Sequence, residues 1–345
     1  MMKLRIGIIG VGGIALSRHI PAFLKLSDHC TITALSDMNF ARAKEASETL
    51  NIPYVFEQYH QMFSEVDAVC ICTPNKFHAE ITIAALEAGV HVMCEKPMAL
   101  SAAECESMIA ASHKAEKVLA IAYHYRFMKE AAAAKRAMQE VGMPLVTRVQ
   151  ALRRRKVPGW GVFTNKELQG GGSLIDYGCH LLDLSLWLMG NPKATDVVGS
   201  TYNALSKMPG QVNLWGNFDH ETFNVDDHVT AYIKFENGAS MLFETSWASN
   251  IKDDHEHVSI SGVDGGLSVF PLELYKTENG MLVNSQPVYI PGEEDAGLPQ
   301  ARNFIDACLG NAPLIVKPEE ALQVSQIIEA IYENSMSGNR EGVLK

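Results

Sequence analysis

The stretch Leu4-Arg5-Ile6-Gly7-Ile8-Ile9-Gly10-Val11-Gly12-Gly13-Ile14-Ala15 decides the fold of the first part of this chain. Residues 4–9 form a short apolar run typical of a buried strand, and residues 10–15 fit the pattern G-x-G-x-x-G/A at the start of a predicted helix. The first glycine makes a tight turn, the second lets the backbone approach a pyrophosphate, and Ala15 permits close helix–strand packing. The helix N-terminus offers free N–H groups to phosphates. We therefore expect a dinucleotide site at Gly10, Gly12, Gly13 and Ile14.

A carboxylate follows this loop at the distance that a dinucleotide site needs. Asp37 ends the second predicted strand, 22 residues after Ala15, close to the spacing of about 20 residues at which an acid binds the adenosine ribose hydroxyls. The same negative charge would repel a 2′-phosphate. The sequence thus favours NAD over NADP. The alternative to a nucleotide site is a glycine turn followed by an aspartate that only caps a helix.

The first 124 residues alternate between apolar strand patterns and amphipathic helix patterns. This rhythm predicts a parallel sheet with helices on both faces, which is a Rossmann domain. Pro21 is expected to disturb the first helix. The predicted strands are 4–9, 31–35, 66–72, 90–94 and 118–122, and the predicted helices are 13–26, 40–50, 77–88 and 102–115, with a further helix at 128–140 just beyond this part.

The pattern changes after about residue 124 and predicts a second domain of the α+β class with an open, mainly antiparallel sheet. We expect an NAD-binding Rossmann domain at 1–124 and a substrate-binding and oligomerisation domain at 125–345, with the C-terminal helices as candidates to pack back on the first domain. The predicted strands are 145–155, 197–199, 228–235, 239–247 and 257–261, and the predicted helices are 179–189, 299–309 and 318–335.

Polar residues gather where the predicted strands end, the edge at which open α/β sheets bind ligands. Three such clusters are 72–78, 94–98 and 123–127, and each could also be only a polar loop. A fourth follows the run Gly170-Gly171-Gly172, where Asp176 and His180 stand near the start of a helix. A carboxylate beside an imidazole can orient it and raise its basicity. The alternative for this pair is a capping aspartate and a core histidine.

Taken together, these motifs resemble the Gfo/Idh/MocA family, the glucose–fructose oxidoreductases and inositol dehydrogenases. The resemblance covers nearly the whole chain and implies a dehydrogenase that oxidises a secondary hydroxyl of a sugar, glycoside, inositol or related polyol. It is specific for the family and poorly specific for the substrate. It rests on Gly10–Ala15, Thr73-Pro74-Asn75 with His78, Glu95-Lys96-Pro97, Arg126-Phe127, the segment from Gly170 through Asp176 and Gly178 to His180, and Pro318–Leu322.

The resemblance also implies roles for single residues. Lys96 matches the family's catalytic lysine, His180 its acid/base histidine, and Asp176 the acid that shares the site. The Lys96–Pro97 bond is commonly cis in the family. The cofactor-lining positions are Thr73, Pro74, Asn75, His78, Glu95 and Lys96, and the expected substrate-binding residues are Lys96, Arg126, Trp160, Asp176 and His180. From its own sequence context, Trp160 in a Pro-Gly-Trp-Gly loop could stack on the nicotinamide or a sugar face, or could simply pack.

Charge and composition exclude several other classes of function. The net charge of -11 argues against binding to nucleic acid or to an anionic membrane. The sequence shows neither a signal-peptide pattern nor an apolar run of about 18 residues, and its seven scattered cysteines suit a reducing compartment. We therefore expect a cytoplasmic enzyme. It needs no metal if a lysine supplies the positive charge, and we interpret 226–228 and 253–257 as solvated polar stretches.

A homodimer or homotetramer is expected, because strands 228–235 and 239–247 carry apolar residues that we assign to both faces, while helices can cover only one face. The family resemblance points the same way. Two other functions stay open at this point. One is an enzyme that retains NAD through a non-redox net reaction, as some glycosidases do, and the other is an NAD-binding regulator without chemistry.

Overall fold

The computed structural model describes residues 3–336, and the chain divides into two compact units. The first comprises Met1–Met128 and Glu293–Leu322, and the second comprises Lys129–Gly292 and Gln323–Lys345. Segment 293–322 thus folds with the N-terminal unit, although the sequence assigns it to the predicted domain 125–345. The last residues of that predicted domain, 337–345, lie outside the described part of the chain. Over residues 3–336, no helix combines the length and the apolar character that crossing a membrane requires.

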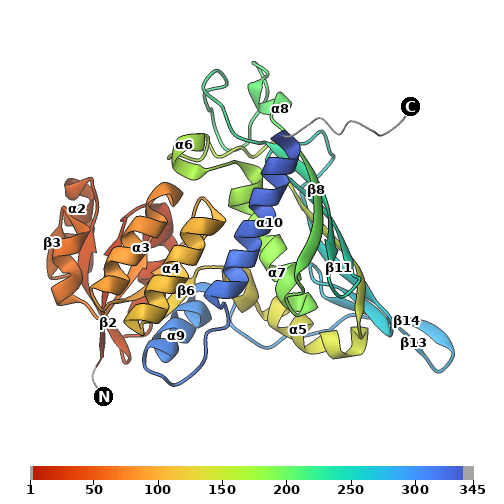
Figure 1. Cartoon of the computed structure of the whole chain (residues 1–345), viewed down its shortest axis with the longest axis horizontal. Coiled ribbons are helices and arrows are strands. Elements are labelled where there is room, and N and C mark those ends of the chain that lie inside the picture. Colours follow the sequence, from red (N-terminus) through yellow and green to blue (C-terminus); the bar gives the residue numbers. More distant parts are fainter. Residues whose placement is uncertain (1–2, 337–345) are drawn as a thin grey trace. The chain divides into compact units, whose positions relative to one another are not determined.

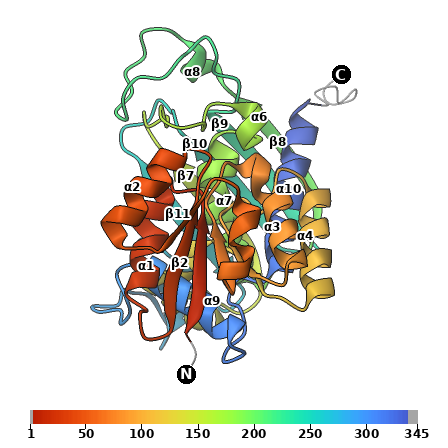
Figure 2. The same ribbon diagram turned by 90° about the vertical axis from the view of Figure 1, so that its left-hand side faces the viewer.

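The first unit contains a six-stranded parallel sheet in the order β3-β2-β1-β4-β5-β6. Figure 2 shows α1 and α2 on one side of this sheet and α3 and α4 on the other. The strands are β1 (Leu4–Ile9), β2 (Cys30–Ser36), β3 (Tyr54–Phe56), β4 (Ala68–Ile71), β5 (His91–Cys94) and β6 (Leu119–Ile121). The helical segments are η1 (Ala15–His19), α1 (Ile20–Leu24), α2 (Phe40–Leu50), η2 (Tyr59–Glu65), η3 (Asn75–Phe77), α3 (His78–Glu87), α4 (Ala102–Ala115), η4 (His124–Phe127) and α9 (Gly297–Cys308).

The sequence explains why these elements begin and end where they do. Pro21 lies in a helix that runs without a break from Gly13 to Leu24, and the turn before it, η1, is a short π-helix, which is the disturbance expected from a proline. Ser101 begins α4 with a capping box, because its hydroxyl accepts from the Glu104 N–H while the Glu104 carboxylate accepts from the Ser101 N–H. Helix α9 packs against α1, and its Phe304 joins the core formed by β1 and β2.

The second unit contains an eight-stranded sheet in the order β14-β13-β12-β11-β7-β10-β9-β8. Every neighbouring pair is antiparallel except β7 and β10, which confirms the mainly antiparallel sheet. The strands are β7 (Pro144–Leu152), β8 (Ala194–Tyr202), β9 (His228–Phe235), β10 (Ser240–Ser246), β11 (His255–Gly262), β12 (Gly265–Ser268), β13 (Glu273–Glu278) and β14 (Met281–Ser285). The helical segments are α5 (Lys129–Val141), α6 (Lys166–Gln169), η5 (Leu174–Gly178), α7 (Cys179–Met189) and α8 (Ala204–Lys207), and α10 (Pro318–Met336) ends beside β8 (Figure 1).

The faces of this sheet correct one argument from the sequence. Thr245 pairs directly with Val229, so the apolar residues of β9 and β10 share one buried face rather than occupying both. The opposite face carries mostly polar side chains, with Tyr232 and Leu242 as exposed apolar exceptions. The expectation of a second, broadly apolar face was therefore wrong, and the oligomeric state stays a prediction that rests on the family resemblance. The residues of the shared face are Val229, Ala231, Ile233, Met241, Phe243 and Thr245.

His91 gives the first unit a defined response to acid. Its Nδ1 accepts a hydrogen bond from the Val118 N–H at 3.0 Å, which joins β5 to the chain entering β6. Burial, helped by Lys117 and opposed by Asp67, lowers the pKa of His91 to about 4. A histidine in the unfolded chain has a pKa of about 6.5. The contribution of neutral His91 to the free energy of unfolding is therefore complete above about pH 6.5, and it is lost as the pH falls toward the pKa of His91 in the folded state.

We predict that His91→Gln shows a smaller loss of unfolding free energy than the unmodified protein between about pH 6.5 and 4.5. The reason is that protonation of the Nδ1 atom removes the acceptor for the Val118 N–H. Urea unfolding at a series of pH values measures the difference. His113→Gln, on the exposed end of α4, is the matched control. Equal pH slopes for His91→Gln and the unmodified protein would contradict this role.

Candidate active site

The glycine loop lies at the carboxyl end of β1, the central strand where the order of the parallel sheet reverses. Gly10 has φ of +88°, and a Cβ atom there would lie 2.7 Å from the backbone carbonyl of Cys72. A Cβ on Gly12 or on Gly13 would meet no atom within 4 Å. The loop therefore packs tightly on its inner side and is open on its outer side, which is the shape that a pyrophosphate needs.

Asp37 ties this loop to the start of α2. Its Oδ2 accepts from the Val11 N–H and its Oδ1 accepts from the Asn39 N–H, both at 2.7 Å. Arg42 places Nη1 3.8 Å from Oδ2, which makes a long ion pair. Each carboxylate oxygen keeps a further lone pair that could accept from a ribose hydroxyl. Asp37 thus shapes the loop and keeps acceptor capacity on both carboxylate oxygens.

The chain after β4 and the chain after β5 meet at the same sheet edge. Thr73 and Pro74 lead into η3, where Asn75 is buried, and the Lys96–Pro97 peptide is cis, as expected. The Thr73 Oγ1 is buried and has no hydrogen-bond partner within the described chain. Such an unused polar atom beside the glycine loop fits a site that a cofactor completes.

His78 lies between these two loops. Its ring is fully buried, with Nδ1 2.8 Å from the Pro97 carbonyl oxygen and Nε2 3.0 Å from the Thr73 carbonyl oxygen. Burial lowers the pKa of His78, while the two carbonyl oxygens, which accept hydrogen bonds from the ring, oppose that shift. The side chain therefore joins the two loops from beneath. This geometry gives His78 a positioning role, and the cofactor contact that the resemblance implies stays a prediction.

Glu95 and His19 form a buried pair beneath the lysine. The His19 Nε2–H donates to Glu95 Oε1 at 2.7 Å, and the Lys96 N–H donates to Glu95 Oε2 at 3.0 Å. Burial alone would raise the pKa of Glu95, but His19 and Lys96 outweigh it and lower that pKa to about 2. Glu95 is therefore an ionised carboxylate that fixes the backbone of the half-buried Lys96.

Arg126 was expected to bind substrate, and its surroundings argue against that role. The guanidinium side chain is fully buried, forms an ion pair with Glu320 and donates to the carbonyl oxygen of Ile315 at 3.1 Å. All three residues belong to the first unit. Arg126 therefore anchors the returning segment 293–322 to η4, a structural role that the sequence spacing of almost two hundred residues conceals.

In the second unit, Asp226 holds the glycine run in place. Its Oδ1 accepts from the Gly172 N–H at 2.8 Å and from the Tyr332 hydroxyl at 2.7 Å. Its Oδ2 accepts from the Ser173 hydroxyl at 2.8 Å and from the Leu174 N–H at 2.9 Å. A Cβ on Gly172 would lie 1.9 Å from the Asp226 carbonyl oxygen, so only glycine fits there. The interpretation of Asp226 as a solvated residue was wrong.

The segment that Asp226 anchors carries the two residues that the sequence singled out. Asp176 lies in η5, where its Oδ2 accepts from Trp247 Nε1–H at 3.0 Å and stands 4.0 Å from Arg153 Nη1. His180 follows four residues later in the first turn of α7 and is 7% exposed. Residues spaced in this way lie on neighbouring helical turns. The fold of this unit therefore brings Asp176 and His180 to the same end of α7.

Aromatic rings and one arginine surround Asp176 within the second unit. The Arg153 guanidinium carbon lies 4.0 Å from the ring centre of Tyr177 and 4.5 Å from that of Trp215. The Trp215 ring contacts that of Trp160 at 5.3 Å between centres, and Trp160 is half exposed. An exposed indole beside a stacked guanidinium offers both an apolar face and hydrogen-bond donors, which suits a sugar ring.

Sequence reasoning missed four residues of these sites: His19, Trp215, Asp226 and Trp247. Trp247 ends the strand pattern that predicts β10, so its alternation with buried Thr245 could have placed it on the inner face. The other three have no local signal, because each acts on residues far away in the chain.

We predict that Asp226→Ala lowers the free energy of unfolding by at least about 3 kcal/mol, because several buried donors lose their shared acceptor. Asp226→Asn should also lower the free energy of unfolding. One of the two side-chain oxygen atoms becomes an NH2 group, which places a donor against the N–H of Gly172 or Leu174. Asp196→Ala, which breaks a long exposed pair with Lys234, is the control and should change stability by less than about 0.5 kcal/mol. Urea unfolding measures all three, and similar values for Asp226→Ala and Asp196→Ala would refute the anchoring role.

Comparison with known proteins agrees with this geometry. Residues 4–123 match an oxidoreductase family with an NAD-binding Rossmann fold, and residues 137–343 match the C-terminal alpha/beta domain of the same family. D-glucoside 3-dehydrogenase of Escherichia coli K12 is 35% identical over 344 residues, which cover 98% of this chain and 97% of that protein. Myo-inositol 2-dehydrogenase of Thermotoga maritima is 30% identical over 191 residues, or 54% of this chain and 55% of that protein.

Among solved structures, aldose-aldose oxidoreductase from Caulobacter crescentus, complexed with glycerol, is 26% identical with a TM-score of 0.82 and covers 98% of this chain and 99% of that one. The family matches span both parts of the chain, and the first relative aligns from end to end. The chain therefore belongs to the Gfo/Idh/MocA family and is an oxidoreductase that acts on sugar or polyol hydroxyl groups through an NAD-binding Rossmann domain.

Proposed function

We propose that this enzyme oxidises a secondary ring hydroxyl of a sugar glycoside with NAD, and that Lys96 and His180 are its catalytic groups. The observation that carries the proposal is the lysine held by a buried, ionised Glu95 at the sheet edge that also carries the open glycine loop. The end-to-end similarity to a D-glucoside 3-dehydrogenase supports a glycoside as the substrate.

The residues at the sheet edge fit NAD. We assign the open space at Gly12 and Gly13 to the pyrophosphate and Asp37 to the ribose hydroxyls, and the buried Thr73 hydroxyl offers an unused hydrogen bond. When bound, NAD supplies the acceptor for the hydride that leaves the carbinol carbon. The protein must then handle the remaining proton and the charge that develops on the substrate oxygen.

Lys96 is suited to stabilise that charge. Its backbone is fixed by Glu95 Oε2, and its side chain is half-buried, where a positive charge acts more strongly on an alkoxide than it would in water. The Glu95 carboxylate is already engaged by His19 and by the Lys96 N–H. We assign the Lys96 ammonium to the reacting oxygen of the substrate.

His180 is suited to take the hydroxyl proton. It is mostly buried at the start of α7, on a segment that Asp226 fixes through the glycine run. Asp176, one helical turn earlier, is held by Trp247 and lies near Arg153. We assign Asp176 to orient the substrate and to balance the positive charge that His180 acquires. The Trp160 ring, supported by Trp215, is assigned to an apolar face of the sugar.

We predict that Lys96→Ala and His180→Ala each lower kcat by about 10²–10⁴-fold while leaving the Kd for NAD nearly unchanged. Because both groups serve one chemical step, the double variant should lose little more than the worse single variant. NADH production and NAD titration measure the two quantities. Lys44→Ala, on an exposed face of α2, is the control. Near-normal kcat in either variant would remove its catalytic assignment.

The substrate assignment has its own test. We predict that glycosides reduce NAD with a higher kcat/KM than free inositols, measured by NADH formation over a panel of sugars, glycosides and inositols. Activity on inositols alone would contradict the glycoside. Cleavage of a glycoside without net NADH, by protein that retains its NAD through purification, would favour the non-redox alternative instead.

The preference for NAD over NADP is expected to depend on Asp37. We predict that Asp37→Ser raises kcat/KM with NADP relative to NAD by at least about tenfold, because the repulsive carboxylate is gone and Arg42 is released to bind a 2′-phosphate. Arg42→Ala combined with Asp37→Ser should lose most of this gain. Equal kcat/KM for the two cofactors in the unmodified protein would show that Asp37 does not discriminate between them.

A further inference from the structure

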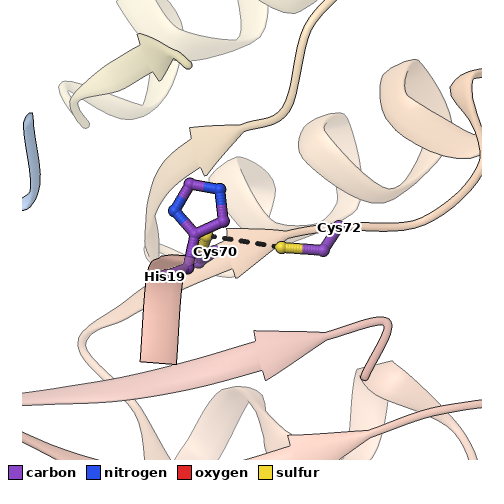
Figure 3. A group of neighbouring side chains, drawn as sticks. All are labelled: His19, Cys70 and Cys72. Carbon is purple, nitrogen blue, oxygen red and sulfur yellow. Dashed lines mark hydrogen bonds between the residues drawn. The ribbon is translucent and has the colours of Figure 1, made fainter. Parts of the chain in front are cut away.

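His19, Cys70 and Cys72 form a cluster in the first unit, and its two cysteines take no part in the proposed reaction. Figure 3 shows His19 on η1 close to the two cysteines, which come from β4 and from the residue just after it. Cys70 and Cys72 stand two positions apart in extended chain, so their side chains leave the same face. One potential ligand atom from each of the three residues lies within 4.8 Å of the others.

The spacing of the two sulfur atoms matches a metal site. Their Sγ atoms are 3.7 Å apart. Two thiolates that bind one tetrahedral ion at about 2.3 Å stand about 3.8 Å apart, so the pair already has the distance that such an ion requires. A disulfide would require the sulfurs to approach to about 2.05 Å, and none of the seven cysteines forms one. The resting geometry thus favours coordination over oxidation.

The surroundings of His19 supply the second feature of a metal site. A histidine that binds a metal usually donates its other ring N–H to a carboxylate, which fixes the ring. The His19 Nε2–H donates to Glu95 Oε1 at 2.7 Å, and both side chains are buried. The carboxylate also supplies negative charge next to the cluster.

We propose that His19, Cys70 and Cys72 bind a thiophilic divalent cation of the Zn²⁺ class. Two thiolates and one imidazole are a ligand set that selects such ions over Mg²⁺ or Ca²⁺, which prefer oxygen. His19 and Cys70 are almost completely buried and Cys72 is partly exposed, so the cation enters from the side of Cys72. A water molecule completes a tetrahedral set.

The test uses the full chain, reduced and freed of metal, and titrates it with Cd²⁺ as a spectroscopic probe. We expect one equivalent to bind with the ultraviolet band of thiolate-to-cadmium charge transfer, and Zn²⁺ to abolish that band by displacement. Cys70→Ser, Cys72→Ser and His19→Ala should each weaken binding by at least about tenfold, and Glu95→Gln by about 10–100-fold. Cys308→Ser, which removes a thiol on α9 of the same unit, should leave the affinity unchanged.

The proposal fails if the protein shows no such band with micromolar Cd²⁺, if the band survives Cys70→Ser combined with Cys72→Ser, or if Cys308→Ser removes it. Should the serine variants not fold, X-ray absorption of the zinc-loaded unmodified protein decides. The expected first shell contains two sulfurs at about 2.3 Å and at least one nitrogen at about 2.0–2.1 Å. A shell of nitrogen and oxygen alone would overturn the assignment.

Discussion

The close approach of Gly10 to the backbone of Cys72 is the contact on which the first unit depends. A side chain at Gly10 would strike the Cys72 carbonyl, and the positive φ there disfavours other residues. The contact joins the end of β1 to the end of β4, where the strand order reverses. The open face of the glycine loop, the unused Thr73 hydroxyl and the Cys72 thiol all lie beside this junction because the two backbones meet there.

In both units a buried carboxylate accepts hydrogen bonds from backbone N–H groups of a loop. Loops at a ligand site cannot rely on strand hydrogen bonds, so their backbone N–H groups need another acceptor. Glu95 accepts from the Lys96 N–H and from His19 in the first unit. Asp226 accepts from Gly172 and Leu174 in the second. In each case the charge offsets its desolvation through several hydrogen bonds, and the loop that it holds carries a residue assigned to catalysis.

The sequence predicts the fold and the family more fully than it predicts the roles of single residues. Local periodicity is sufficient for elements such as α2 and α4, whose bounds agree with the expected ones, and the glycine fingerprint places the nucleotide edge. The short polar strands β12, β13 and β14 carry too little apolar alternation to be predicted. We assigned the apolar residues of β9 and β10 to opposite faces because the register between two strands cannot be determined from the sequence of either strand alone.

His78 and Arg126 show where a resemblance stops being informative about mechanism. Both belong to motifs that identify the family, yet one is buried between two loop carbonyls and the other is buried against Glu320. Motif membership therefore measures how strongly a position is constrained, and does not separate a side chain that touches a ligand from one that holds the loop that does. Burial and partner geometry make that separation. Lys96 differs from both, because its backbone is fixed while its side chain is only half-buried, and this difference is why we propose it as a residue that contacts the substrate.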